Sequence, residues 1–232
     1  ALFYRNMMEK DMDRVEIPCN QNDYTHIIWD FNGTLLDDIR LGIDSVNTML
    51  EKRGLPVIPD EDTYRHVFGF PVDIYYRRLG FDFEAEDYDT VLAPEWVAHY
   101  LAGEAGCGLI PGAAEVVTAI GEKGIPQLVL SATKIEQLKG QIRRLGLEDA
   151  FEEILGLDNI HARSKVNLAL DWKERHPHAR PLFIGDTEHD ADVADAIGAD
   201  CILFCGGHQA EEILRGRGKP VIACMTDVLQ YL

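Results

Sequence analysis

Residues 27–35 of this chain read Ile-Ile-Trp-Asp-Phe-Asn-Gly-Thr-Leu. A short apolar run ends in Asp30, and a Gly-Thr turn follows after two further residues. This pattern predicts a buried strand that delivers a carboxylate to the edge of a sheet, which is where α/β enzymes bind their ligands. Asn32 stands two residues after Asp30. Its amide cannot usefully donate a proton, whereas an acid at that position could.

The rest of the chain alternates between stretches that predict strands and stretches that predict helices. Apolar runs that end in small or acidic residues predict strands at 26–31, 127–131, 182–186, 201–205 and 221–224. Apolar residues at helical spacing predict helices at 113–123, 134–145, 168–174 and 190–197. Glycines that suit a left-handed helix stop stand at 124, 146 and 198. This alternation is typical of an α/β fold, here a Rossmann-like parallel sheet with helices on both faces.

Residues 38–108 interrupt the alternation, since they contain no convincing strand. They predict helices at 39–53, 60–67, 72–79 and 85–101, punctuated by proline and glycine. We therefore expect an inserted α-helical cap at 38–108, a core formed by 23–37 and 109–232, and an N-terminal arm at 1–22 without an assigned function. An insert at the carboxyl end of a strand lies over the site that α/β enzymes form there.

Composition argues against several classes of partner. The 232 residues are 46% apolar, as in ordinary globular proteins, and carry a formal net charge of -18. This charge disfavours nucleic acid as a partner, because phosphate backbones attract clustered Lys and Arg. No apolar run approaches the ~20 residues of a membrane span, and the first ten residues lack a signal sequence. We expect a soluble, cytoplasmic protein with neither a nucleic-acid nor a membrane partner.

The cysteines fit a reducing compartment. The five are scattered, and their number is odd. Cys201 and Cys205 lie four residues apart, and buried thiols are a better interpretation of this pair than a metal or redox site.

Side chains that carry chemistry recur at the ends of the predicted strands. Asp30, Ser131 and Asp186 each end a strand, Asp190 follows four residues later, and Lys165 stands just before a helix. Because the ends of parallel strands meet at one crevice, we expect these five side chains to lie together. Three carboxylates form a hard-oxygen site that suits Mg²⁺ and leaves room for a phosphate oxygen. A lysine beside them can pair with a carboxylate that attacks phosphorus, and a hydroxyl can bind phosphate.

With these residues in place, the chain resembles the haloacid dehalogenase superfamily of hydrolases, and in particular its phosphoglycolate-phosphatase-like members. Residues 30–34, Asp-Phe-Asn-Gly-Thr, match the family's first motif, Asp-x-Asp-x-Thr, except that Asn32 replaces the second aspartate. Ser131 and Lys165 match the second and third motifs. Residues 185–190, Gly-Asp-Thr-Glu-His-Asp, match the fourth, Gly-Asp-x-x-x-Asp. The insert matches the family's cap, and the resemblance covers residues 23–232.

The resemblance implies a role for each of these residues. Asp30 would be the nucleophile, and catalysis would involve Asp30, Asn32 and Lys165. Mg²⁺ would be held by Asp30, the backbone carbonyl of Asn32 and Asp186, while Asp190 would support the metal and Lys165 from behind the direct ligands. The substrate's phosphate would contact Gly33, Thr34, Ser131, Ala132 and Lys165, with Thr34 also steadying the loop.

Simpler interpretations stand beside several of these assignments. Asp186, Asp190 and Ser131 could cap the helices that follow them, and Thr133 could share the work of Ser131. His189 is expected to be a neutral residue at the rim rather than a metal ligand or a proton shuttle. Residues 103–108 are expected to form a hinge rather than a phosphate loop, because they follow no strand. Surface charge is the default interpretation of four cap residues that could instead touch substrate: Arg65, His66, Arg77 and Arg78.

Asn32 decides how far the expected mechanism holds. In the family's phosphatases the second aspartate protonates the leaving oxygen and later activates water, and such help is typically worth ~10²–10⁴-fold. We expect a Mg²⁺-dependent phosphatase of a small phosphorylated metabolite, acting through an aspartyl-phosphate, that is slow or selective for good leaving groups such as acyl phosphates or anhydrides.

Two other accounts of Asn32 stay open. Another residue, such as a cap or rim histidine, could donate the proton. Alternatively, the chain could bind a phosphorylated ligand or partner with little turnover. An engineered Asp-to-Asn change would leave the same pattern in the sequence.

Overall fold

The computed structural model describes residues 24–157 and 164–232, so the predicted arm at 1–22 lies outside the described residues. The predicted α/β fold is confirmed, because a six-stranded parallel sheet in the order β5-β4-β1-β6-β7-β8 forms its centre. The strands are β1 (His26–Trp29), β4 (Gln127–Lys134), β5 (Glu153–Leu157), β6 (Pro181–Gly185), β7 (Asp200–Phe204) and β8 (Val221–Ile222). The sequence does not predict β5, because this edge strand is half exposed and lacks a continuous apolar run.

β1 lies in the middle of the sheet, between β4 and β6. Its residue Ile28 pairs with Leu128 of β4 and with Phe183 of β6. The chain passes from β1 to β4 and β5 on one side, and then crosses to β6, β7 and β8 on the other. This reversal makes β1 the switch point of the sheet, where α/β folds place their ligand sites. The carboxylate of Asp30, directly after β1, therefore stands at the centre of the crevice.

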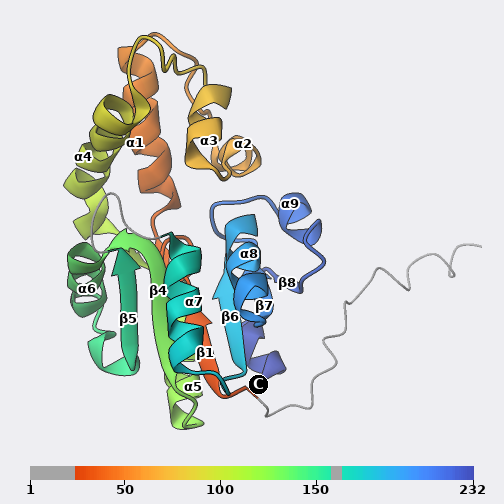
Figure 1. Ribbon diagram of the computed structural model, residues 1–232. Helices are drawn as coiled ribbons and strands as arrows, with labels where there is room; N and C mark the ends of the chain where they lie inside the picture. The colour runs from red at the N-terminus through yellow and green to blue at the C-terminus, as the bar shows by residue number, and fades with distance from the viewer. Residues whose placement is uncertain (1–23, 158–163) are drawn as a thin grey trace, which may run out of the picture.

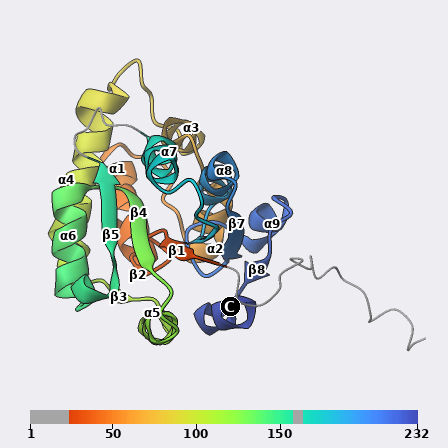
Figure 2. The ribbon, with the colours of Figure 1, turned by 60° about the horizontal axis from the view of Figure 1, so that its bottom comes forward.

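Helices cover both faces of the sheet, as predicted (Figure 2). The helical segments of the core are α5 (Ala113–Glu122), α6 (Ile135–Arg144), η3 (Glu148–Ala150), α7 (Lys165–Arg175), α8 (Glu188–Ile197), α9 (Glu211–Arg215) and η4 (Met225–Tyr231). α5 and α6 pack on the face that carries Trp29, whereas α7 and α8 cover the face that carries Ile28. Because both faces are buried, β1 is apolar at consecutive positions. The predicted left-handed stops are confirmed at Gly124, Gly146 and Gly198.

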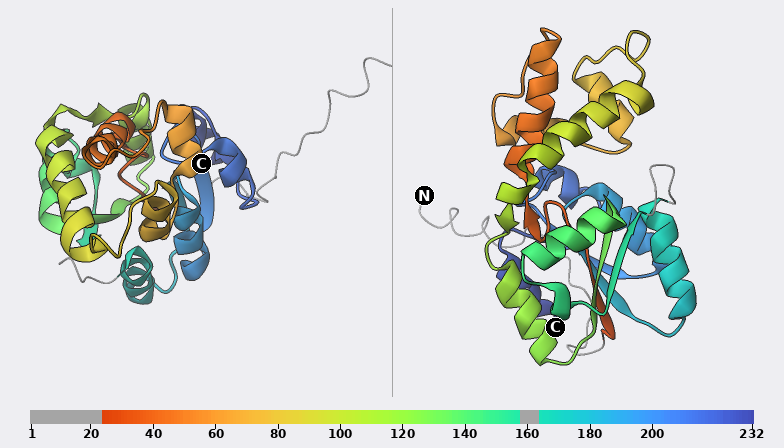
Figure 3. Two further views of the ribbon diagram at one scale, coloured as in Figure 1. Left: turned by 90° about the horizontal axis from the view of Figure 1, so that it is seen from above. Right: turned by 90° about the vertical axis from the view of Figure 1, so that its left-hand side faces the viewer.

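Between β1 and β4, a group of helices stands above the carboxyl ends of the strands (Figures 1 and 3). This helical insert contains α1 (Ile39–Lys52), α2 (Glu61–Val67), α3 (Val72–Arg78), the π-helical turn η1 (Tyr88–Leu92), α4 (Ala93–Gly103) and the 3-10 turn η2 (Glu104–Gly106). A helical insert at the place expected from the sequence is thus present. The prediction of one helix at 85–101 is wrong at its start. Asp87 caps a π-helical turn by accepting a hydrogen bond from the backbone N–H of Thr90 (2.9 Å), and α4 begins only at Ala93.

Two short strands join the helical insert to the core. β2 (Leu36–Asp37) and β3 (Gly108–Leu109) pair antiparallel and hold the outgoing and returning chain side by side. Strands of two residues are too short to leave an alternating pattern, so they do not show in the sequence. Within the insert, Arg53 binds both Glu86 and Glu95, the latter with 2.7 Å between Nη2 and Oε2. These ion pairs tie the end of α1 to α4.

Within residues 24–157 and 164–232, every helix is too short or too polar to cross a membrane.

Cys201 on β7 is buried and Cys205, just after the strand, is half-buried. Both are free thiols, in line with the simpler interpretation of this pair.

Gly156 of β5 allows the end of β4 to bulge toward it. The pairing of β4 with β5 shifts register between Leu130 and Lys134. A Cβ at Gly156 would lie 2.7 Å from the backbone oxygen of Thr133 and 2.9 Å from the Cα of Ile135. These are backbone atoms, which cannot move aside without displacing the strand end. Gly156 therefore helps to place the end of β4, which carries Thr133.

We predict that Gly156→Ala lowers the free energy of unfolding by roughly 1–3 kcal/mol, because it overpacks a backbone contact. Gly140→Ala in α6 is the matched control, since a Cβ there meets nothing within 4 Å. Alanine in a helix stabilises by about 0.5–1 kcal/mol relative to glycine. Urea unfolding followed by circular dichroism measures both changes. Equal stabilities of Gly156→Ala and the unchanged protein would contradict this account of the strand end.

Candidate active site

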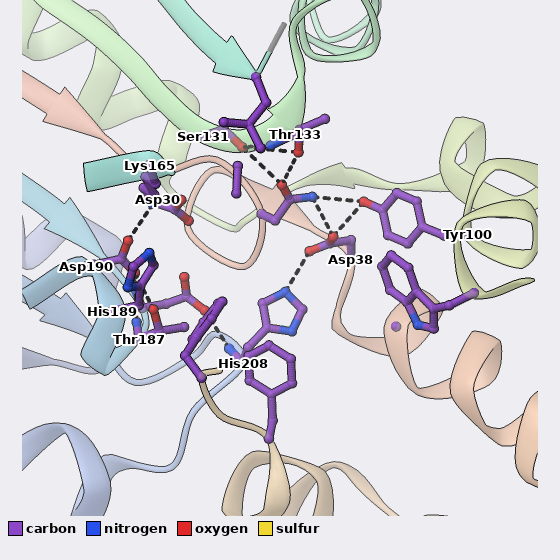
Figure 4. A pocket seen from close by; sticks show the side chains of 18 of the residues that line it. Asp30, Asp38, Tyr100, Ser131, Thr133, Lys165, Thr187, His189, Asp190 and His208 are labelled. Atoms are coloured by element: carbon purple, nitrogen blue, oxygen red, sulfur yellow. Dashed lines mark hydrogen bonds and ion pairs between the residues drawn. The ribbon is translucent and has the colours of Figure 1, made fainter. Parts of the chain in front are cut away.

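A cavity of about 570 Å³ lies between the carboxyl ends of the strands and the helical insert (Figure 4). Its size is typical of small-molecule sites. The five side chains that the sequence predicts to lie together all line it: Asp30, Ser131, Lys165, Asp186 and Asp190. They arrive from β1, β4, α7, β6 and α8, so the parallel topology assembles them from segments far apart in the chain.

Lys165 is held between two carboxylates. It is the first residue of α7, whose N-terminus is capped by Ser164. Its Nζ donates to Oδ1 of Asp30 and to Oδ1 of Asp190, the latter at 2.5 Å. Burial lowers the pKa of this ammonium, but the two carboxylates outweigh burial and raise the pKa above its usual value. Lys165 therefore stays charged on the floor of the cavity.

Asp190 has both of its carboxylate oxygens in use. Oδ1 binds Lys165, and Oδ2 accepts hydrogen bonds from the backbone N–H groups of Asp186 (3.1 Å) and Thr187 (2.9 Å) and from the Thr187 hydroxyl (2.8 Å). The bond from the Thr187 backbone N–H is one half of a capping box at the start of α8, whose other half runs from the Asp190 backbone N–H to the Thr187 side chain. Burial raises the pKa of Asp190, but Lys165 and Thr187 outweigh it and hold the pKa below its usual value. Asp190 is thus a helix cap and a partner of Lys165 at once.

Asp30, Asp186 and Asp190 form a buried carboxylate cluster, with one oxygen of each within 4.8 Å of the others. Burial raises the pKa of Asp30 to about 6 and raises that of Asp186 well above its usual value. Lys165 supplies one positive charge against these three carboxylates, so negative charge remains uncompensated. A hard divalent cation with oxygen ligands, such as Mg²⁺, fits this donor set.

The side chain of Asn32 is fully engaged. Its amide nitrogen donates to Oδ2 of Asp38 (2.8 Å) and to the hydroxyl of Tyr100 (2.9 Å). Its amide oxygen accepts from the hydroxyls of Thr133 (2.8 Å) and Ser131 (3.4 Å). A carboxylate in the same place would face the carboxylate of Asp38 without a donor between them. Asp38 therefore favours an amide over an ionised acid at position 32.

Asp38 and His208 form a second charged pair, which the sequence does not predict. Nε2 of His208 lies 3.2 Å from Oδ1 of Asp38, and Nδ1 lies 2.8 Å from the hydroxyl of Tyr64 on α2. Burial lowers the pKa of His208, but Asp38 outweighs burial and raises the pKa to about 9. Burial raises the pKa of Asp38, but His208 outweighs it and keeps that pKa below its usual value. Through these contacts His208 of the core binds both Asp38, at the start of the insert, and Tyr64, on α2 of the insert.

Two of the residues predicted to contact phosphate are engaged elsewhere. The backbone N–H of Gly33 donates to Oδ1 of Asp38 (2.9 Å). Thr34 is fully buried, and its hydroxyl donates to Asp30 (3.1 Å) and Asp186 (2.9 Å), so it steadies carboxylates rather than lining the cavity. Gly33 has a φ of 73°, and a Cβ there would lie 2.4 Å from Oδ2 of Asp186, so glycine is required. The other predicted phosphate contacts do line the cavity: Ser131, Ala132 and Lys165.

Four charged residues of the insert lie outside the lining of the cavity. These are the four that the sequence suggests for substrate contact: Arg65, His66, Arg77 and Arg78. Arg65, for example, donates its Nε to the backbone oxygen of Gly207 (2.8 Å) and so ties α2 to the core. His189 lines the cavity, and its ring stacks on that of Phe70 with 4.8 Å between centroids.

A family model described as haloacid dehalogenase-like hydrolase matches residues 27–204. The chain belongs to this family. The match runs from the strand that carries Asp30, through the helical insert, to the end of β7. The resemblance drawn from the four motifs is therefore confirmed.

Several known proteins are similar to the chain over most of its length. It is 28% identical to a phosphoglycolate phosphatase from Rhodobacter capsulatus, over 79% of this chain and 85% of the relative. It is 30% identical to the tyrosine-protein kinase PtkA of Mycobacterium tuberculosis, over 84% of this chain and 67% of the relative. A haloacid dehalogenase-like hydrolase from Streptococcus pneumoniae shares the fold, with a TM-score of 0.75 over 90% of this chain and 98% of that one, at 19% identity.

We predict that Mg²⁺ stabilises the protein against thermal unfolding more at about pH 7.5 than at about pH 5. Without metal, the pKa of Asp30 is raised to about 6, so protons compete with a metal for this carboxylate at the lower pH. For the same reason, the contribution of Asp30 to the stability of the metal-free protein falls as pH rises through about 6. Unfolding curves recorded with Mg²⁺ and with EDTA measure the change in the free energy of unfolding. This change amounts to about 2.7 kcal/mol when the Mg²⁺ concentration is a hundred times Kd.

Two variants control this experiment. Asp186→Asn should lose the stabilisation by Mg²⁺. Asp195→Asn removes an exposed carboxylate of α8 and should keep it. A Mg²⁺ effect that is equal at both pH values, or that survives Asp186→Asn, would rule out the cluster as the metal site.

Proposed function

We propose that this protein is a Mg²⁺-dependent phosphatase that transfers the phosphoryl group of a small phosphate monoester to Asp30. The observation that carries the proposal is the ion-paired arrangement of Asp30, Lys165 and Asp190 beside Asp186 in one cavity. Similarity to relatives named as phosphoglycolate phosphatases supports a phosphate monoester as the substrate class. Residues 38–108 would act as the cap that covers the site and limits access of water.

The reaction takes two steps. In the first, a carboxylate oxygen of Asp30 attacks phosphorus, a new O–P bond forms, and the leaving oxygen departs with the electron pair of the broken P–O bond. In the second, water attacks the phosphorus of the aspartyl-phosphate, which releases inorganic phosphate and restores Asp30. Lys165 orients Asp30 and favours its ionised form. Ser131 and Ala132 line the cavity, and the hydroxyl of the first and the backbone N–H of the second would bind the phosphate oxygens.

Asp30, Asp186 and the backbone carbonyl of Asn32 would hold Mg²⁺. The ion would supply charge neutralisation between the phosphate and the attacking carboxylate. Asp190 would act from behind these ligands, because its Oδ2 already accepts three hydrogen bonds at the start of α8 and its Oδ1 pairs with Lys165.

Neither histidine of the cavity is placed to supply the proton that Asn32 cannot donate. Both ring nitrogens of His208 are engaged, one by Asp38 and one by Tyr64. Burial lowers the pKa of His189, so its ring is neutral near pH 7 and a weak proton donor. The proposed phosphatase therefore prefers leaving groups that depart without protonation. The alternative function that Asn32 would allow is binding of a phosphorylated ligand with little turnover. Measurement of phosphate release distinguishes this alternative from a phosphatase.

We predict that Asp30→Asn abolishes phosphate release from p-nitrophenyl phosphate, because an amide cannot form the acyl phosphate that water then cleaves. The measurement is inorganic phosphate released with Mg²⁺ present. The control is Asp195→Asn on α8, which removes one exposed carboxylate and should keep full activity. Full activity of Asp30→Asn would remove Asp30 as the nucleophile. No release from any monoester by the unchanged protein would favour ligand binding instead.

We predict that Asn32→Asp raises the turnover of an alkyl phosphate by roughly 10²-fold, and that of p-nitrophenyl phosphate much less, because only the alkyl leaving group needs a proton donor. The new carboxyl would lie where the amide now meets Asp38 at 2.8 Å. Two carboxyl groups at such a short distance share one proton, so one of them stays protonated, as a general acid must be. Steady-state kinetics with both substrates measure the ratio, and equal gains would contradict the missing-acid account.

A further inference from the structure

The part of the cavity wall that the helical insert contributes is aromatic and aliphatic. Apart from Asp38 and Gly42, these lining residues are Tyr64, Phe68, Phe70, Trp96, Val97, Tyr100 and Leu101. Trp96 and Tyr100 stack along α4 with 4.9 Å between ring centroids, and Phe68 and Phe70 meet edge to face at 5.6 Å. The insert thus presents ring faces and ring edges to whatever occupies the cavity.

Part of this apolar wall is open to solvent. Phe70 is 41% exposed, and Val97 and Leu101 are each 44% exposed. Single exposed apolar residues are ordinary, but several in one cavity indicate a binding surface. A ligand that covers them gains free energy by removing apolar area from water.

The same wall offers little to an acidic leaving group. The cations that line the cavity, within the described ranges, all come from the core: Lys134, Lys165 and His208. Lys165 and His208 are held by carboxylates, and Lys134 is exposed at the end of β4. On the side of the insert, a leaving group that carries its own carboxylate, like that of phosphoglycolate, would meet aromatic rings and no cation. Burial of a charge without a partner is unfavourable.

Asn32 independently indicates that the leaving oxygen must be stable as an anion. Without an acid at this position, the oxygen departs as an anion. A phenol loses its proton at a pKa of about 10, whereas an alkanol is nearly as weak an acid as water, at about 15.7. A phenolate therefore depends much less on general acid catalysis than an alkoxide does.

We propose that the substrate is an aryl phosphate monoester, whose ring packs against Phe70, Trp96 and Leu101 while its phosphate meets Asp30. The substrate class rests on the proposed phosphatase function and adds the chemistry of the leaving group. Attack by Asp30 breaks the P–O bond, and the oxygen leaves with its electron pair as a phenolate, which takes a proton from solvent. Small aryl phosphates and the phosphorylated tyrosine side chain of a peptide share this chemistry.

Three monoesters separate the polarity of the leaving group from its stability as an anion. Phenyl phosphate has an apolar leaving group that is stable as an anion. Benzyl phosphate has an apolar leaving group and phosphoglycolate an acidic one, and neither is stable as an alkoxide. We expect kcat/KM for phenyl phosphate to exceed that for benzyl phosphate by roughly 10²-fold or more. Benzyl phosphate should exceed phosphoglycolate by roughly tenfold or more, since only its leaving group covers the apolar wall. Comparison of 2-naphthyl phosphate with a phosphotyrosyl peptide then identifies the source of the aryl phosphate by the larger kcat/KM.

A matched pair of variants tests the wall itself. Val97→Lys places a cation in the cavity, and should lower kcat/KM for phenyl phosphate by roughly tenfold and raise that for phosphoglycolate. Val91→Lys changes a residue of the same insert that is 39% exposed but lies outside the lining, and should leave both values unchanged.

The outcomes separate this inference from the function on which it rests. If phosphoglycolate is hydrolysed as fast as benzyl phosphate, or if phenyl and benzyl phosphate are hydrolysed alike, the aryl class is overturned while the phosphatase stands. The same holds if Val97→Lys and Val91→Lys behave alike. If none of the monoesters releases phosphate, the proposed phosphatase function itself fails.

Discussion

The site depends on one charge balance, that of Lys165 between the buried carboxylates of Asp30 and Asp190. Burying a carboxylate alone is costly, and removing one partner of a buried ion pair typically costs about 3–5 kcal/mol. Lys165 lets β1, α7 and α8 bring their ends together. The balance is incomplete, because Asp186 adds a third carboxylate without adding a cation. The same shortage of positive charge that would destabilise the metal-free site is what suits it to Mg²⁺.

The sequence predicts that the residues on the floor of the site lie together, because they stand near the carboxyl ends of strands or near the starts of helices in a parallel sheet. Asp30, Ser131 and Asp186 can be placed by that rule alone. The rule does not reach Asp38 and His208, which are 170 residues apart and meet only in the folded chain. No local pattern marks either one. The edge strand β5 and the two-residue strands β2 and β3 escape prediction because they are too exposed or too short to carry a periodic signal.

Position 32 shows how the insert and the core share one network. The amide joins Asp38 and Tyr100 of the insert to the hydroxyls at the end of β4, so its contacts are specific to an amide. The absence of an acid there leaves the carboxylates and Lys165 in place, as the proposed transfer of a phosphoryl group to Asp30 requires. It also calls for a leaving group that is stable as an anion, which an aryl phosphate would supply.

The central claim is that Asp30 becomes phosphorylated, and trapping of the intermediate tests it most directly. Rapid acid quench during turnover of phenyl phosphate, followed by borohydride reduction, converts an aspartyl-phosphate into homoserine. Peptide mass spectrometry then locates the modified residue. The structure predicts homoserine at position 30, dependent on Mg²⁺. An unmodified Asp30 during steady turnover, or phosphate carried by another residue such as Ser131 or His189, would contradict the account.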